Sequence, residues 1–215
     1  MKSSLALWAA ALLAASPARA AELHRFALFV GDAQGGIGTR PLRYADRDAR
    51  RMHAILPSLG GVPESDALLL TNVDADQVRG ALADLTARLQ RARDGGEPTE
   101  LLVYYSGHAK DGELRLGDSS MPLSELRGLL ERAPADVRIG LLDSCQSGAI
   151  TRAKGVRNVP AFEVQKARVE EATPRGLVLI ASSAADEESQ ESDEINASFF
   201  THYLATGLLG DADAS

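Results

Sequence analysis

The sequence predicts an α/β fold in which helices flank both faces of a mostly parallel β-sheet. Short, continuous apolar runs alternate along the chain with amphipathic stretches of helical period. Parallel strands are buried on both faces, so they are continuously apolar instead of alternating. The length of 215 residues, with 45% apolar and 25% charged residues, suits one globular domain of moderate size.

The first predicted strand is the apolar run 26–30, which Gly31 and Asp32 close. The glycine-rich stretch GDAQGGIGTRP follows it. This stretch does not complete the dinucleotide-binding pattern G-x-G-x-x-G, because Pro41 stands where the third glycine would be. We therefore expect a flexible loop here and no phosphate-binding turn.

Further strands and helices follow in alternation. The strands are expected at 67–72, 100–106, 137–144 and 176–183, with a small hairpin at 112–118. A first helix is expected near 43–57, and a second begins at a capping box formed by Asp74 and Gln77. A third helix is marked by Leu123, Leu126, Leu129 and Leu130, and a last one by Phe200, Tyr203, Leu204 and Leu208.

Two of the predicted strands end at a reactive side chain. His108 follows the strand at 100–106, and Cys145, the only cysteine, ends the strand at 137–144. Because parallel sheets bind ligands beyond the carboxyl ends of their strands, we expect the two side chains to share a crevice. An imidazole can accept the proton of a thiol and later protonate a leaving amine, which suits peptide-bond hydrolysis.

Asp143 lies two residues before Cys145, so its carboxylate and the thiol are expected on the same side of the strand. A carboxylate repels a thiolate and is better suited to hold a cationic substrate side chain. The alternative is an aspartate that only caps a turn. The backbone N–H groups of Ala109 and Cys145 are candidate donors to the oxyanion of the reaction.

These residues resemble the caspase-like cysteine peptidases, most closely the metacaspase and bacterial orthocaspase branch. The similarity lies in Tyr105-Ser106-Gly107-His108, in Asp143-Ser144-Cys145-Gln146-Ser147-Gly148 and in ADRDARRMHAIL, which contains the pair Asp48-Ala49. The similarity covers nearly the whole chain after the first twenty residues, and we expect one peptidase domain over 25–215. The resemblance implies a caspase-like three-layer sandwich with a mostly parallel central sheet.

The resemblance also implies roles for individual residues. Cys145 would be the nucleophile and His108 the general acid and base. Asp143, Asp48 and Ser106 would line the pocket for the residue that precedes the scissile bond. An acidic pocket implies cleavage after Arg or Lys, so the expected substrates are proteins or peptides with basic residues, and no cofactor is required.

The sequence departs from the family pattern around both motifs. Ala109 stands where the family usually has glycine, and its methyl group is expected to crowd the oxyanion site. Gln146 replaces a frequent histidine, and the spacing from His108 to Cys145 is shorter than the roughly 50 residues of animal caspases. Two alternatives to an active peptidase stay open: a weak or inactive homologue that binds peptides or partners, and another cysteine hydrolase acting on amides or esters.

The first residues have the pattern of a secretory signal peptide. Lys2 precedes an apolar run at 5–15, which is short for a membrane span, and Ala18-Arg19-Ala20 forms a cleavage motif. We therefore predict a signal peptide at 1–20 and a secreted or periplasmic protein with no membrane anchor. The net charge of −7 argues against binding to nucleic acid.

Three polar segments complete the chain. Residues 147–175 lack apolar periodicity, and we predict self-processing there after one of the basic residues Arg152, Lys154, Arg157, Lys166, Arg168 or Arg175. The acidic run at 185–194 is interpreted as a solvated loop, with a calcium site or a basic partner as alternatives. Asp211, Asp213 and Ser215 match only the start of a calcium-binding loop, so no metal site is predicted, while calcium dependence and oligomeric state stay open. The abrupt stop there suggests that the natural chain continues.

Overall fold

The structure is a computed structural model that describes residues 22–36, 39–145, 176–183 and 190–210. A parallel sheet lies at its centre with strand order β2-β1-β3-β7-β8. Its strands are β1 (His24–Asp32), β2 (Ala67–Thr71), β3 (Thr99–Gly107), β7 (Val137–Asp143) and β8 (Gly176–Ala181). The five strands that the apolar runs predict are therefore confirmed.

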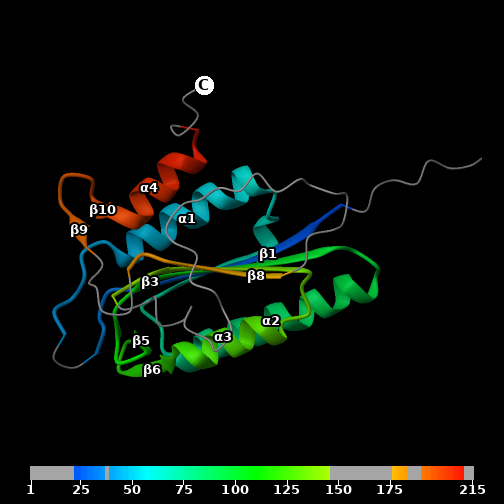
Figure 1. The fold of residues 1–215 in the computed structure, drawn as a ribbon, viewed down its shortest axis with the longest axis horizontal. Helices are drawn as coiled ribbons and strands as arrows, with labels where there is room; N and C mark the ends of the chain where they lie inside the picture. The colour runs from blue at the N-terminus through cyan, green and yellow to red at the C-terminus, as the bar shows by residue number, and fades with distance from the viewer. Residues whose placement is uncertain (1–21, 37–38, 146–175, 184–189, 211–215) are drawn as a thin grey trace, which may run out of the picture.

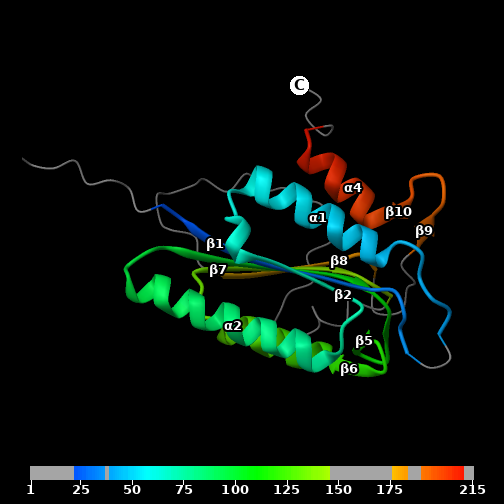
Figure 2. The same cartoon turned by 180° about the vertical axis from the view of Figure 1, so that it is seen from behind.

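Helices cover both faces of this sheet. Figures 1 and 2 show α1 (Ala45–Gly60) and α4 (Phe199–Leu208) on one face, with α2 (Ala75–Asp94) and α3 (Leu123–Arg132) on the other. A short 3₁₀ helix, η1 (Glu64–Asp66), precedes β2. The predicted capping box begins α2, because Gln77 N–H donates to Asp74 and the Gln77 side chain accepts from Asp74 N–H. The three-layer α/β fold is confirmed.

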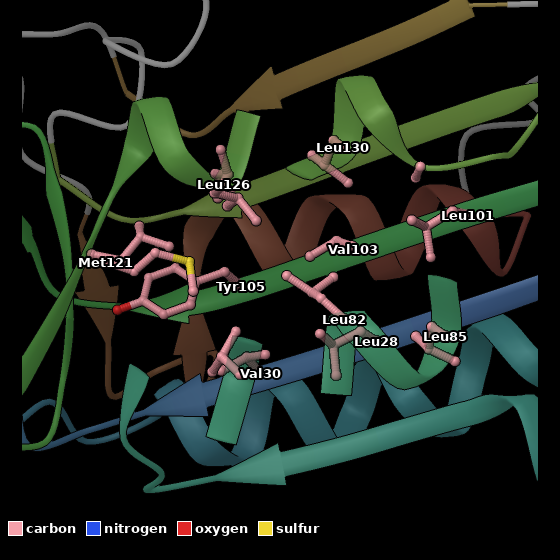
Figure 3. Packing of buried hydrophobic residues seen from close by; sticks show 14 of the residues in the cluster. Leu28, Val30, Leu82, Leu85, Leu101, Val103, Tyr105, Met121, Leu126 and Leu130 are labelled. Atoms are coloured by element: carbon pink, nitrogen blue, oxygen red, sulfur yellow. The ribbon is translucent and has the colours of Figure 1, made fainter. Parts of the chain in front are cut away.

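The larger part of the core lies between the sheet and α2 and α3. Alternate residues of β1 and β3 point to this face and meet leucines of both helices, as Figure 3 shows for Leu28, Val30, Leu82, Leu85, Leu101, Val103, Tyr105, Leu126 and Leu130. A second cluster on the other face contains Phe29, Met52 and Tyr104. Each fully buried side chain of this size contributes about 1.5–3 kcal/mol to folding. The two clusters hold the carboxyl ends of the strands in a fixed register.

Two small sheets at the carboxyl edge differ from the predicted elements. The hairpin expected at 112–118 is three-stranded, with β4 (Ala109–Lys110), β5 (Glu113–Leu116) and β6 (Ser119–Pro122). Within the run expected to be a solvated acidic loop, β9 (Glu191–Ser192) pairs with β10 (Ala197–Ser198). The loop prediction is wrong at Glu191, because its carboxylate accepts the backbone N–H groups of Arg43 and Tyr44.

The last helix, α4, is confirmed, but only part of its expected apolar stripe packs on the sheet: Leu204 lies against the second cluster, whereas Leu208 is exposed. Tyr203 is 68% exposed, whereas Thr201 and Ala205 are buried. A polar contact also contributes to this orientation, because the Thr201 hydroxyl donates to the carboxylate of Asp143 on β7. Hydrophobic periodicity cannot identify this part of the contact between α4 and the sheet.

Several predictions fall outside the described residues: the signal peptide at 1–20, the processing sites in 147–175 and the acidic tail from Asp211 on. Among the described segments, no helix combines the length and hydrophobicity needed to span a membrane.

Candidate active site

The register between β3 and β7 brings His108 and Cys145 to the same edge of the sheet. The last residues to pair across these neighbouring strands are Ser106 and Asp143. His108 and Cys145 each lie two residues beyond that pair, and neighbouring strands are about 4.8 Å apart. The two reactive residues singled out in the sequence therefore leave the sheet side by side.

The imidazole of His108 is held on two sides by the loop that follows β1. Its Nε2 lies 3.0 Å from the carbonyl oxygen of Arg40. A carbonyl can only accept, so Nε2 carries the hydrogen of this bond, and in the neutral imidazole the lone pair is then on Nδ1. Gly35 packs against the ring so closely that a Cβ there would lie 2.2 Å from Cδ2 of His108.

Tyr105, on the face of the sheet that α2 and α3 cover, holds the backbone of His108. The Tyr105 hydroxyl lies 2.8 Å from the carbonyl oxygens of both His108 and Arg115, and Arg115 N–H donates to His108 O at 2.8 Å. Burial raises the pKa of Tyr105 well above its usual value, so the hydroxyl stays a donor. Gly107 is required beside it, because a Cβ there would lie 2.5 Å from the Tyr105 oxygen.

Ala109 follows His108 and does not crowd the oxyanion site as its sequence position suggested. Its methyl group is buried in the apolar cluster below the sheet. His108 pairs with Arg115 through a backbone hydrogen bond, and Ala109 is opposite Leu114 in the next position of the ladder. Because paired positions alternate in an antiparallel ladder, Ala109 N–H points away from β5 and toward the edge.

Cys145 is half-buried in the turn that follows β7. The preceding residue, Ser144, is held by the two residues that follow β8: its N–H donates to the Ser182 hydroxyl at 3.1 Å, and its carbonyl accepts from the Ser183 hydroxyl at 2.9 Å. Sequence reasoning missed both serines. The available signal was their position directly after an apolar strand, at the same edge as Cys145.

Asp143 and Asp48 are both buried on the side of the sheet that α1 and α4 cover. Ser198 joins them, because its N–H donates to Asp48 Oδ2 at 3.0 Å and its hydroxyl donates to Asp143 Oδ2. Thr201 donates a further hydrogen bond to Asp143 at 2.7 Å. Ser106 is also buried and pairs with Asp143 through the strand register. The structure thus brings together the three residues that the resemblance implies for one pocket.

Asp48 differs from Asp143 in that one of its oxygens has no partner. Within the described residues, Oδ1 of Asp48 is buried and accepts no hydrogen bond. Burial raises the pKa of Asp48 to about 7; the nearby charges of Asp143 and Glu191 act in the same direction, whereas the Ser198 N–H and Arg51 oppose them. Near neutral pH the group therefore exchanges between its protonated and ionised forms.

A cavity of about 410 Å³ borders His108. Its lining residues are Arg40, Pro41, Leu42, Arg43, His108, Glu191 and Asp193. Arg43 forms an ion pair with Asp193, which also accepts from the Tyr44 hydroxyl at 2.7 Å. These contacts join the residue that follows β9 to the loop that supplies the Arg40 carbonyl, so the cavity has a defined wall. Elsewhere in the described ranges, no group of three or more His, Cys, Asp and Glu residues is arranged to hold a metal ion.

Comparison with known proteins identifies the family to which the chain belongs. The sequence model of the caspase domain matches residues 24–213. The chain belongs to the caspase domain family. Members of the caspase domain family are cysteine peptidases, and the resemblance drawn from the two motifs is confirmed at the level of this family.

The fold of this caspase domain is similar to the crystal structure of caspase-1 from Spodoptera frugiperda. The TM-score is 0.61 at 14% sequence identity, and the match covers 88% of this chain and 71% of that one. At this identity the likeness concerns the fold alone. Among curated proteins, none matches the caspase domain described here.

Proposed function

We propose that this caspase-domain protein is an exported cysteine endopeptidase that hydrolyses peptide bonds after Arg or Lys. The observation that carries the proposal is Oδ1 of Asp48, which is buried and accepts no hydrogen bond from the described residues. Ser198 links the other oxygen of Asp48 to Asp143, two residues before Cys145. A buried carboxylate oxygen without a partner is costly, and a cationic side chain offers both donors and charge.

The bond-breaking steps use Cys145 and His108. The thiol of Cys145 gives its proton to Nδ1 of His108, and the thiolate attacks the carbonyl carbon of the substrate. His108 then protonates the leaving nitrogen as the carbon–nitrogen bond breaks, and water hydrolyses the acyl-enzyme with His108 as base. The Arg40 carbonyl keeps the ring oriented and interacts favourably with the imidazolium that forms.

The developing oxyanion requires donors at the same edge. The backbone N–H of Ala109 points away from β5, and the N–H of Cys145 lies in the turn after β7. Donors fixed in this way stabilise a tetrahedral intermediate without reorganisation, and each contributes about 10²–10³-fold to the rate.

The pocket accounts for the preference for a basic residue. Asp143 already accepts from Ser198 and Thr201, so its main contribution is negative charge. Asp48 has a buried oxygen that accepts no hydrogen bond from the described residues and would pair with a guanidinium or ammonium group that enters the pocket, and Ser106 pairs with Asp143 in the strand register. An acidic side chain before the scissile bond would meet two carboxylates and be excluded.

The test is a comparison of fluorogenic peptides that carry Arg, Lys or Asp before the cleaved bond, under reducing conditions. We expect turnover of the Arg and Lys peptides only, and none by Cys145→Ala. Asp48→Asn should lose most of the activity on basic peptides, while the matched surface variant Asp94→Asn should keep it. Turnover of the Asp peptide would contradict the proposed specificity of the pocket but not the proposed roles of Cys145 and His108. Parallel reactions with calcium and with a chelator test calcium dependence.

Self-processing is part of the same proposal. The segment 147–175 is rich in basic residues and follows the nucleophile in the sequence. The purified enzyme should be cut within this segment after Arg or Lys, and mass spectrometry of the fragments identifies the bond. Purified Cys145→Ala protein that is still cut there would exclude self-processing.

A further inference from the structure

Asp32 is a fully buried carboxylate at the end of β1, and the reaction proposed above does not use it. Its exposed fraction is 0%. Oδ1 accepts the backbone N–H groups of Gln34 at 2.9 Å and Gly35 at 3.2 Å, and Oδ2 accepts that of Gly117 at 3.0 Å. One side chain thus ties together the loop after β1 and the turn between β5 and β6.

Both of these segments contact His108. Gly35 lies against the imidazole, where a Cβ would be 2.2 Å from Cδ2 and 2.6 Å from Cγ. Gly117 directly follows β5, whose Arg115 donates its N–H to the His108 carbonyl. Asp32 also pairs with Gly107, the residue before His108, in the register of β1 and β3. The ring and the backbone of His108 are therefore both fixed by elements that converge on Asp32.

We propose that Asp32 is a positioning residue for the His108–Cys145 dyad and that it acts through the backbone of Gly35 and Gly117. The inference rests on the proposed function, since it concerns the geometry of the same dyad. Asp32 supplies acceptors only, and all three neighbours are N–H donors. An asparagine has the same shape but one acceptor oxygen, so its NH₂ group would face either Gly117 N–H or the amides of Gln34 and Gly35. One attachment must then separate.

The experiment compares Asp32→Asn with Asp94→Asn, a matched change at an exposed position, in the full chain. Leu85→Ala removes a buried side chain of α2 and shows the effect of lowered stability alone. We expect Asp32→Asn to lower kcat by about 100-fold with little change in KM, because small misplacements of a reacting group have effects of this size. Asp94→Asn and folded Leu85→Ala should keep the kcat of the wild type.

A second readout follows the His108 ring by NMR in protein labelled at histidine, with the signal assigned by its loss in His108→Ala. Asp32→Asn should change the chemical shift and the titration curve of His108, whereas Asp94→Asn and Leu85→Ala should not. If Asp32→Asn does not fold, Gly35→Ala tests the contact between the loop after β1 and the His108 ring. The His108 signal must then shift in Gly35→Ala. Wild-type kcat together with an unmoved His108 signal in Asp32→Asn overturns the proposal, as does an unmoved signal in Gly35→Ala.

The two readouts separate this inference from the proposed function. A wild type that cleaves no peptide while its His108 signal responds to Asp32→Asn and not to the controls would support the positioning role and count against the peptidase. A wild type that cleaves basic peptides while Asp32→Asn changes neither kcat nor the ring would do the reverse.

Discussion

The two ends of the sheet each hold a histidine, and the two histidines have different kinds of partner. At the amino end, His24 lies between two carboxylates, with Nδ1 at 2.9 Å from Glu97 and Nε2 at 3.0 Å from Asp66. At the carboxyl end, His108 uses one nitrogen to donate to a neutral carbonyl, that of Arg40. Two carboxylates favour a ring that keeps both protons, whereas a single neutral acceptor leaves the second nitrogen able to exchange its proton with a substrate.

The carboxylates at the two ends of the sheet also differ in how many partners they have. Asp66, at the amino end, accepts from His24 with one oxygen and faces Arg88 with the other. Asp48, at the carboxyl end, has a buried oxygen that accepts no hydrogen bond from any described residue. Polar groups whose bonding capacity is filled within the chain hold the fold together. A group with unfilled capacity at a buried site is a candidate for binding a ligand.

The largest effect on activity should come from removing His108, the histidine at the carboxyl end of the sheet. We expect His108→Ala to lower kcat/KM on basic peptides by about 10²–10⁴-fold, since this is the usual contribution of a general acid and base. His24→Ala, the matched change at the other end, should retain most activity. The rate at which iodoacetamide alkylates Cys145 gives an independent measurement, and its pH dependence should change in His108→Ala alone. Equal losses in both variants would remove the distinction between the two ends.

The second effect concerns the unfilled oxygen of Asp48. A cationic side chain binds the ionised carboxyl group, and the pKa of Asp48 is raised to about 7 by burial. Affinity for a basic peptide should therefore rise as pH increases through 7, by about tenfold between pH 6 and 8, as the ionised fraction grows from about a tenth to about nine tenths. Calorimetry with the Cys145→Ala protein and a peptide ending in Arg measures this without turnover.

Asp48→Asn is the control for this pH dependence. It removes the titrating group, so the peptide should bind weakly and with a nearly constant affinity over the same range. A rise that persists in Asp48→Asn would assign the titration to another group and separate Asp48 from substrate binding.

The difference between the two ends also explains what the sequence could and could not predict. His108 and Cys145 could be found because each is a reactive side chain directly after an apolar strand, which is a local signal. The Arg40 carbonyl could not, because it is a backbone group whose role is independent of residue type. Ser198 and Thr201 lie more than fifty residues beyond Asp143, and their hydroxyls reach it because the chain returns to pack α4 on this face of the sheet. Hydrophobic periodicity describes the core, and it says nothing about which polar groups meet across the edge of the sheet.

The smallest effect should come from the amino end of the sheet. There, His24→Gln tests whether the two carboxylates favour a protonated imidazole ring. The hydrogen bond to Asp66 raises the pKa of His24 above its usual value, the bond to Glu97 adds to this, and partial burial opposes both. A neutral imidazole has one N–H and cannot donate to both carboxylates, so the stabilisation belongs to the protonated ring. This stabilisation is fully present below the pKa of the unfolded chain, near 6.5, and is lost as pH rises through the higher pKa of the folded protein.

His24 is one-third exposed, so solvent screening keeps its contribution to stability below about 1 kcal/mol. Thermal unfolding of wild type and His24→Gln should therefore differ more at pH 6 than at pH 9, with peptidase activity unchanged in both; a difference that grows toward pH 9 would mean that His24 is held in its neutral form.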